Sequence, residues 1–490
     1  MLFNTLDFVV FFIIALTIIA IIKKRNFQHI FIILASYFFL YYSSSYQITL
    51  LIFTTLWTFY LAREIHLTSN IVRKKQFLVL TLGGNLGLLG FFKYAGFTIS
   101  ELNGMLNHFG ITNIPELNLI LPIGISFYTF HAIGYVIDVY RGNTQPSKSL
   151  KEYMLFVTFF PQLVAGPILR AGQFLPQLRE KVDNLKERTK LRLIVIESHN
   201  LKLGLTMMIF GFMKKMLFAD NIAPMVNHIF ANPVGAESFT IILGAVAFAV
   251  QIYGDFSGYS DIAIGAALIM GFKIPQNFNK PYFALSPADF WRRWHISLST
   301  WVRDYLYFPL VFNNRKSDLR VFISLMTSFF FLGLWHGAGL NFAIYGILHG
   351  SYVSIETVLR KHSKFLRENT FFKSKIGKMI SILVTQYLVF FAFIAFRIQD
   401  LDQMFYTMKK YVILDFAFSQ TLYMIKSFEL PIILMTTFII LHYISYKKHN
   451  VLESIANLKL SKWFLFSTLC ILLIVLFYGG NAKEFIYFEF

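Results

Sequence analysis

The sequence predicts an all-α polytopic membrane protein with about ten to twelve transmembrane helices, together with re-entrant segments and interfacial helices. Of its 490 residues, 56% are hydrophobic and only 14% are charged, which is not the balance of a soluble domain. Long apolar runs recur along the chain, and basic residues gather between them. No internal repeat or second soluble domain is visible, so we expect one domain over residues 1–490.

The apolar runs are the expected membrane helices. Several approach the ~20 residues that cross a hydrocarbon core of ~30 Å. They cover Phe8–Ile22, Phe31–Tyr42, Phe77–Phe92, Leu119–Val139, Phe239–Val250, Val321–Leu334, Ile380–Phe396, Ile432–Ile444 and Trp463–Tyr478.

The charges around the first run set the expected topology. No basic residue precedes the run, and Lys23, Lys24 and Arg25 follow it, which reverses the charge order of a cleavable signal peptide. We therefore expect an uncleaved helix with its N-terminus outside. The loops then expected in the cytoplasm are rich in Lys and Arg: Arg63–Lys75, Arg141–Lys151, Arg170–Lys202, Lys273–Arg320, Arg360–Lys378 and Lys447–Lys462.

The intervening loops agree with this topology, because Thr98–Glu116 and Asp220–Ser238 contain neither Lys nor Arg. Lys93, Lys214 and Lys215 do not fit, since they lie near the expected outer ends of apolar runs. The formal charge of +19 does not indicate nucleic acid here, because basic residues of membrane proteins gather in cytoplasmic loops near anionic headgroups. The single cysteine, Cys470, excludes an internal disulfide and a thiolate metal cluster.

Two segments disturb a simple count of crossings. Tyr153–Leu169 and Val321–Gly350 each return to a basic stretch on the side from which they started, so we expect re-entrant pieces or tight hairpins. The first contains Pro161 and Pro167 and is not one regular helix; Gln162 and Arg170 are expected to face protein or water. An ordinary cytoplasmic loop is the alternative.

The stretch "LSPADFWRRWHISLSTWVRDY" predicts a helix that begins at Ser286, with Pro287 in its first turn and Asp289 three residues after the cap. Large apolar side chains then recur at helical spacing on one face, and the arginines lie mostly on another face. We therefore expect an interfacial helix with its indoles at headgroup depth. A purely structural anchor is the alternative. His295 is the residue that an anchor does not need.

In "FFFLGLWHGAGLNF", His336 lies sixteen residues past Arg320 inside an apolar stretch. A continuous helix would place its imidazole ~24 Å from that arginine. An ionisable group so deep is a functional candidate, and a neutral packing histidine is the alternative. For His131 and His349, also in apolar runs, packing is the favoured interpretation.

In "QIYGDFSGYSDIAIGAA", Asp255 and Asp261 interrupt an apolar span, and glycines are expected to loosen its backbone. Such a segment should line a polar cavity, or form a cytoplasmic turn. The chain contains no glycine-rich phosphate loop, no Gly-x-Ser-x-Gly elbow and no His-Glu-x-x-His helix, which leaves histidine as the strong catalytic candidate.

With these motifs in hand, the sequence resembles the membrane-bound O-acyltransferase family, and within it the membrane subunits of bacterial alginate and peptidoglycan O-acetyltransferases. The resemblance runs through almost the whole chain. It is densest in "LPIGISFYTFHAIGYVIDVYRG", "FPQLVAGPILR", "DFSGYSDIAIG", "NFNKPYFALSPADFWRRWHISLSTWVRDYLYFPL", "GLWHGAGLNFAIYGILHG" and the closing "FIYFEF".

The resemblance implies a helical funnel in the bacterial inner membrane, in which a cytoplasmic donor, acetyl-CoA, meets an acceptor from the outer face. The family's deep histidine maps onto His336 and its second histidine onto His295. Arg292, Arg293 and Arg303 could meet the donor's phosphates. Further supporting residues are Asp255, Asp261 and Trp335, and no metal is implied.

The implied acceptor is a cell-envelope polysaccharide, reached directly or through an extracytoplasmic esterase-like (SGNH) partner. Two alternatives stay open. A transporter or flippase of a lipid-linked glycan would also bury polar groups, and its mark would be inverted internal symmetry, which is not visible here. A membrane scaffold of a polysaccharide export complex would explain the anchors but not the two histidines.

Overall fold

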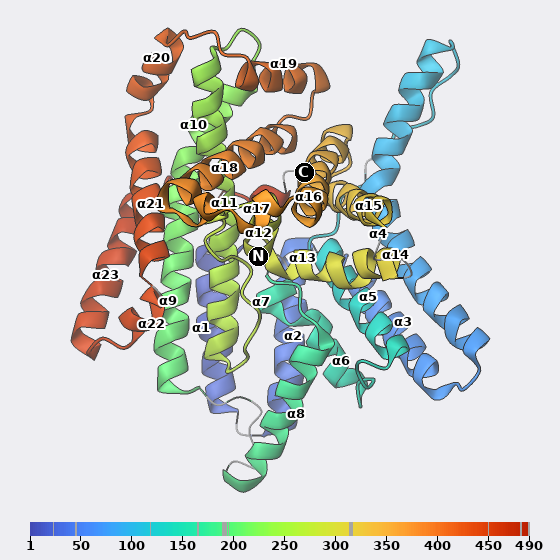
Figure 1. The fold of residues 1–490 in the computed structure, drawn as a ribbon. Coiled ribbons are helices and arrows are strands. Elements are labelled where there is room, and N and C mark those ends of the chain that lie inside the picture. The colour runs from blue at the N-terminus through green and yellow to red at the C-terminus, as the bar shows by residue number, and fades with distance from the viewer. Residues whose placement is uncertain are drawn as a thin grey trace. The chain divides into compact units, whose positions relative to one another are not determined.

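The fold is described from a computed structural model. It describes residues 1–22, 24–44, 47–117, 119–163, 166–188, 194, 196–312, 317–448, 450–480 and 483–488. Lys23, which belongs to the basic cluster after the first apolar run, lies outside these residues, as do 189–193 and 195 of the loop Arg170–Lys202. Within the described ranges the chain forms helices and no strand (Figure 1), so the predicted all-α class is confirmed.

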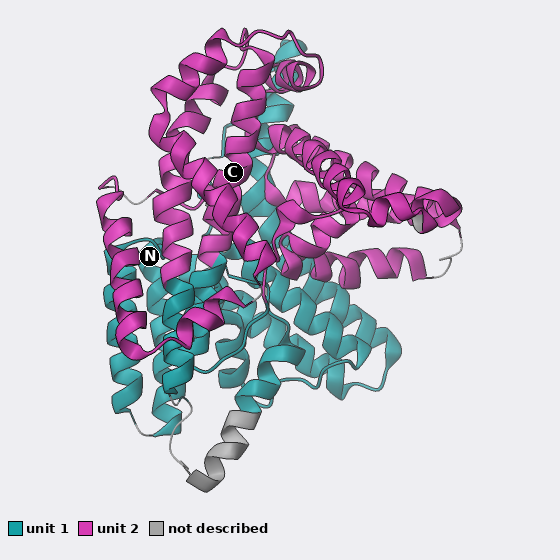
Figure 2. Ribbon diagram, turned by 60° about the vertical axis from the view of Figure 1, so that its left-hand side comes forward, with its two compact units in different colours: residues 1–208, 260–275 teal, residues 209–259, 276–490 magenta. Residues whose placement is uncertain are grey.

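Contacts group the chain into two compact units (Figure 2). Unit 1 comprises residues 1–208 and 260–275, and unit 2 comprises residues 209–259 and 276–490. Helices α9 (Ser198–Phe212) and α11 (Ser238–Ile269) contribute residues to both. The expectation of a single domain over 1–490 stays a prediction.

Among the described residues, unit 1 contains eight further helices. They are α1 (Leu6–Ile21), α2 (Arg25–Ser44), α3 (Ile48–Leu67), α4 (Ile71–His108), α5 (Ile125–Arg141), α6 (Leu150–Thr158), α7 (Phe160–Leu163) and α8 (Ala171–Arg188). Helices α3, α4 and α5 pack on one another. The short helices α6 and α7 confirm the predicted break in "FFPQLVAGPILR", and Gln162 is fully buried there, where its amide donates to Phe156 O at 2.6 Å.

His131 of α5 is a packing histidine in this unit, as favoured from the sequence. It is 1% exposed, and its Nε2 accepts a hydrogen bond from the Leu169 N–H at 3.0 Å. The bond satisfies a backbone donor in the irregular segment between α7 and α8, where no helix supplies a partner.

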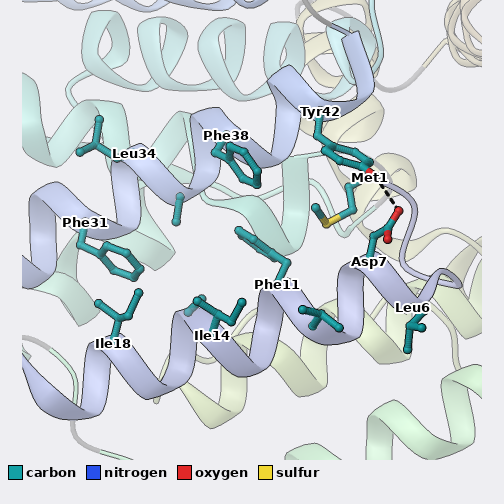
Figure 3. Close-up of a pocket in the computed structure, with 13 residues that line it drawn as sticks. Met1, Leu6, Asp7, Phe11, Ile14, Ile18, Phe31, Leu34, Phe38 and Tyr42 are labelled. Atoms are coloured by element: carbon teal, nitrogen blue, oxygen red, sulfur yellow. Dashed lines mark hydrogen bonds between the residues drawn. The ribbon is translucent and has the colours of Figure 1, made fainter.

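Unit 1 also holds an apolar groove of ≈ 670 Å³ between α1 and α2 (Figure 3). Phe11, Phe31 and Phe38 are among its walls. At one end the Tyr42 hydroxyl donates to Asp7 Oδ2 at 2.7 Å. The residues that line this groove come from α1, α2 and the segment before α1, and neither His295 nor His336 is among them.

Unit 2 contains the remaining helices. They are η2 (Met213–Ala219), α10 (Asp220–Ala231), η3 (Pro281–Phe283), α12 (Pro287–Arg293), α13 (Ile296–Val302), η4 (Arg303–Tyr307), α14 (Phe308–Val311), α15 (Asp318–His336), α16 (Leu340–His362), α17 (Lys364–Glu368), η6 (Thr370–Lys373), α18 (Lys375–Arg397), α19 (Leu401–Val412), α20 (Ser419–Ser427), α21 (Glu429–Lys447), α22 (Val451–Ala456), α23 (Leu460–Leu476) and η7 (Ile486–Phe488).

Membrane-spanning capacity is spread over both units. Seven of the described helices are long and apolar enough to cross a bilayer: α3, α4, α11, α15, α16, α18 and α21. Helices α1 and α23 are apolar but shorter. The chain is therefore a multi-pass membrane protein, and the expected total of ten to twelve crossings stays a prediction.

An exposed ion pair ties the loop after α19 to the start of α11. Lys410 Nζ lies 2.8 Å from Asp415 Oδ2, and Asp415 also accepts from the Ser238 N–H. The Lys410 ammonium, together with the N–H groups of Ala417 and Ser238, lowers the pKa of Asp415 to about 2. This pair serves below as a reference for one that is buried.

Candidate active site

His336 is the last residue of α15, at the tip of a helical hairpin. Ser317 caps the other end, where its Oγ accepts from the Arg320 N–H at 3.3 Å. The helix is continuous between them, as the depth argument requires, and α16 returns alongside it (Figure 1). A Cβ on Gly333 would lie 2.3 Å from Phe342 O, so glycine is needed where the two helices meet. The predicted hairpin is confirmed.

Four aromatic rings surround the His336 imidazole, which is 3% exposed. Their centroids lie 5.0 Å (Trp335), 5.6 Å (Tyr345), 5.2 Å (Phe396) and 5.4 Å (Tyr487) from the centroid of the imidazole. They come from α15, α16, α18 and η7, so elements far apart in the sequence enclose one titratable group.

The helix predicted to begin at Ser286 does begin there. Ser286 Oγ accepts from the Asp289 N–H at 3.2 Å, and Asp289 Oδ2 accepts from the Leu285 N–H at 3.0 Å. The prediction of one continuous helix is wrong, however, because α12 ends at Arg293 and α13 begins at Ile296. Between them His295 adopts a left-handed conformation, with φ of 42° and ψ of 53°.

The aromatic face of this segment is buried in protein. Trp291 and Trp294 are 5% and 1% exposed, and Trp294 packs on Phe290 and Phe278 at 5.5 and 5.0 Å between ring centroids. The expected interfacial helix with its indoles at headgroup depth is therefore wrong on this point, because both indoles are covered by protein.

Asn277 holds the left-handed turn at His295. Its carbonyl accepts from the Ile296 N–H at 2.9 Å, and its side-chain Oδ1 accepts from the Ser297 N–H at 3.3 Å and the Ser297 hydroxyl at 2.9 Å. A non-glycine residue at positive φ costs roughly 1–3 kcal/mol and persists only where its surroundings fix it. Strain of this kind gathers at functional sites.

The same asparagine sets the proton position on His295. Asn277 Oδ1 lies 3.1 Å from His295 Nδ1, and the Ser297 N–H, which can only donate, identifies this Asn277 atom as the oxygen. In the neutral ring Nδ1 therefore carries the proton and donates, which leaves the lone pair on Nε2. That Nε2 is buried and has no hydrogen-bond partner among the described residues.

The two histidines share one aromatic enclosure, which we define as Phe256, Trp335, Tyr345, Phe396 and Tyr487. Trp335 contacts both imidazoles, at 6.0 Å from His295 and 5.0 Å from His336. Phe256 lies 4.6 Å from His295 and 4.7 Å from Tyr487, which in turn contacts His336. The structure thus brings together the two histidines that the sequence singled out, in a setting where both imidazoles are almost fully buried.

Helix α16 also fixes the segment that carries His295. The Trp291 indole N–H donates to His349 Nδ1 at 3.2 Å, and Glu356 Oε2 accepts from the Ala288 N–H at 2.8 Å. His349 is fully buried. These bonds give His349 a structural role, as favoured from the sequence.

The three arginines each have a carboxylate partner. Arg292 and Arg293 lie 3.4 and 3.0 Å from Asp289, and Arg303 makes a two-point contact with Asp304 at 2.7 and 3.2 Å. The Arg292 side chain is 70% exposed and that of Arg303 is 53% exposed. Both guanidinium groups can therefore reach a ligand in solution, Arg292 the more freely.

The segment around Asp255 differs from the expectation. It is part of the continuous helix α11, so the cytoplasmic turn is wrong. Its glycines permit close packing instead of loosening the backbone: a Cβ on Gly258 would lie 2.7 Å from Gly211 O. Asp255 lies 2.9 Å from Lys215 Nζ, and Asp261 falls in the part of α11 that belongs to unit 1.

Sequence reasoning missed Asn277, Lys215 and Tyr487. Lys215 did give a signal, because it did not fit the expected topology; burial beside Asp255 and Asp220 explains its place. Asn277 gave none, since its role depends on a contact across 18 residues. In the described part of the chain, no three His, Cys, Asp or Glu side chains gather as metal ligands.

Comparison with known proteins identifies the family. The model of the membrane-bound O-acyltransferase family matches residues 145–399, more than half of the chain, and this range includes His295 and His336. The chain belongs to the membrane-bound O-acyltransferase family. The resemblance stated from the sequence motifs is thereby confirmed, and the chain is an acyltransferase that uses an acyl donor.

Named relatives agree with this assignment. The chain is 38% identical to a probable alginate O-acetylase of Pseudomonas putida over 341 residues, which are 69% of this chain and 67% of the relative. It is 36% identical to that of Pseudomonas aeruginosa, over 78% of this chain and 69% of the relative. It is 34% identical to a peptidoglycan O-acetyltransferase of Helicobacter pylori, over 78% and 73%.

Proposed function

We propose that this membrane-bound acyltransferase is an O-acetyltransferase, which moves an acetyl group from acetyl-CoA on the cytoplasmic side of a bacterial inner membrane to a cell-envelope polysaccharide. The observation that carries the proposal is the pair of buried histidines in one aromatic enclosure. The named relatives act on alginate or peptidoglycan, which supports a polysaccharide acceptor of that class. An extracytoplasmic esterase-like (SGNH) partner would relay the acetyl group to the polymer.

His336 acts as general base in the proposed reaction. It accepts the proton of an acceptor hydroxyl, from a sugar or a partner serine, while the hydroxyl oxygen bonds to the acetyl carbon. The carbon–sulfur bond of the thioester breaks, and the proton then passes to the departing sulfur. General base catalysis of this kind contributes about 100- to 10,000-fold to the rate.

His295 orients the donor. Its hydrogen bonding favours this role over polarisation of the thioester carbonyl. The lone pair on Nε2 can accept from an amide N–H of the pantetheine arm but cannot donate to the thioester carbonyl. Trp335 separates and positions the two imidazoles, while Arg292, Arg293 and Arg303 meet the phosphates of the donor.

Purified protein in lipid vesicles tests the function. With acetyl-CoA on one side and alginate or peptidoglycan oligosaccharides on the other, we expect acetyl esters on the sugars, or on the serine of an added esterase-like partner, by mass spectrometry. Movement of a lipid-linked glycan across the vesicle without acetylation would instead favour the flippase. A protein that neither acetylates nor moves a glycan would favour the scaffold.

Replacing Arg292 and Arg303 together by glutamine is expected to raise the KM for acetyl-CoA about tenfold or more, because each change removes a charge-assisted contact. The turnover number should change less, as for groups that bind ground state and transition state equally. The control is Arg360→Gln, an arginine of α16 that is 50% exposed and paired with Glu356. If only turnover falls, these arginines do not hold the donor.

A further inference from the structure

A buried ion pair lies beside the site in unit 2. Lys215 of η2 and Asp255 of α11 are 2.9 Å apart, with side chains 2% and 3% exposed, and Asp220 lies 3.0 Å from the same ammonium. Removing such a pair from water is costly, and apolar side chains of similar volume often stabilise a protein as well or better. Stability alone therefore does not explain this pair.

The remaining hydrogen-bonding capacity of the pair goes to the backbone near the C-terminus. Lys215 Nζ donates to Glu484 O at 2.9 Å, and Asp255 Oδ2 accepts from the Ile486 N–H at 2.8 Å. The two bonds join residues more than 230 positions apart in the chain. Apolar replacements could not make them, so the ion pair has a use that burial of apolar surface would not supply.

The backbone held in this way places two aromatic rings. Phe485 packs on Tyr259 at 4.5 Å and on Phe256 at 5.4 Å. Tyr487 follows with its ring 4.7 Å from Phe256 and 5.4 Å from His336. The closing segment 484–487 thus completes the aromatic enclosure on the side shared by both histidines.

We infer that Lys215 and Asp255 are positioning residues for acyl transfer: they hold segment 484–487 so that Tyr487 closes the enclosure beside His336. The inference rests on the proposed function and adds two residues that touch neither imidazole. Without the pair, the carbonyl of Glu484 and the N–H of Ile486 lose their partners, and the segment leaves the site.

The triple variant Lys215→Met/Asp255→Leu/Asp220→Asn tests this, because it removes all three charges of the cluster together and leaves none of them buried without its partner. We expect the turnover number for acetyl transfer to fall on the order of 100-fold, as for a misplaced catalytic environment. The KM for acetyl-CoA and the thermal unfolding temperature should change little. Lys410→Met, which breaks the exposed pair with Asp415, is the matched control and should keep normal turnover.

A second variant avoids the buried pair altogether. Ile486→Pro deletes the N–H that Asp255 accepts, at the first residue of η7, where the fixed φ of proline is tolerated. It should lower turnover in the same direction. If both variants keep normal turnover per folded molecule, the positioning role is wrong.

Thiol labelling reads the position of the segment without using activity. With Tyr487→Cys in a Cys470→Ala background, we expect slow reaction with N-ethylmaleimide, and a rate at least tenfold higher once Lys215→Met/Asp255→Leu/Asp220→Asn is added, since a released segment is open to solvent. An unchanged rate would overturn the inference. If the purified protein transfers no acetyl group at all, the proposed function fails, while the labelling rates still decide whether the ion pair holds the segment.

Discussion

Replacing His336 with alanine is expected to abolish acetyl transfer, by about 100- to 10,000-fold, while the protein still inserts and purifies as a single species. The imidazole lies at the end of a continuous helix, 3% exposed and enclosed by four aromatic rings. His336→Gln refines the test, because glutamine keeps hydrogen-bonding capacity but cannot act as a base. The measurement is acetyl transfer per folded molecule in vesicles.

His131→Ala is the matched control for that experiment. His131 is also a buried histidine, and its Nε2 accepts from the Leu169 N–H. Its loss leaves a cavity and an unsatisfied backbone donor, so stability should fall while activity per folded molecule stays near normal. If His336→Gln behaves like His131→Ala and retains most of the transfer, His336 is a packing residue and not the base.

The second large effect is expected at His295, where the substitution of choice is asparagine. Asparagine tolerates a left-handed backbone better than most residues, so His295→Asn should not lower the unfolding temperature much. It removes the Nε2 acceptor, and transfer should fall on the order of 100-fold through loss of donor orientation. Steady-state kinetics together with thermal unfolding measure both quantities on one preparation.

Asn277→Ala tests the hydrogen-bond partner of His295 instead of His295 itself. It keeps the imidazole but deletes the Oδ1 acceptor that fixes its tautomer and the Ser297 contacts. Transfer should fall here too, with a clear loss of stability because buried donors lose their partner. Full activity in both His295→Asn and Asn277→Ala would remove His295 from the mechanism.

The features that the sequence predicted well are local or periodic. The Ser286 cap depends on residues three positions apart, and the depth of His336 follows from an uninterrupted apolar helix. Such features need no knowledge of what packs against them, which is why a single sequence is sufficient.

The features that were missed depend on distant partners. The break at His295 exists because Asn277, 18 residues earlier, holds the turn, and the general enrichment of histidine at positive φ does not mark this position in the sequence. Likewise the glycines of α11 allow a neighbouring helix to pack closely, and the sequence of α11 does not reveal that neighbour. The role of Tyr487 depends on its ring contact with Phe256 of α11, a residue far away in the sequence.

Helix α16 packs against the helix that ends in His336 and holds, through His349 and Glu356, the segment that leads to His295. The positions of both imidazoles therefore depend on contacts with the same helix, α16. A displacement of α16 would therefore affect both imidazoles, His336 through the packing of α15 on α16 and His295 through the Trp291–His349 and Ala288–Glu356 bonds. The two candidate catalytic histidines thus depend on one supporting helix for their places.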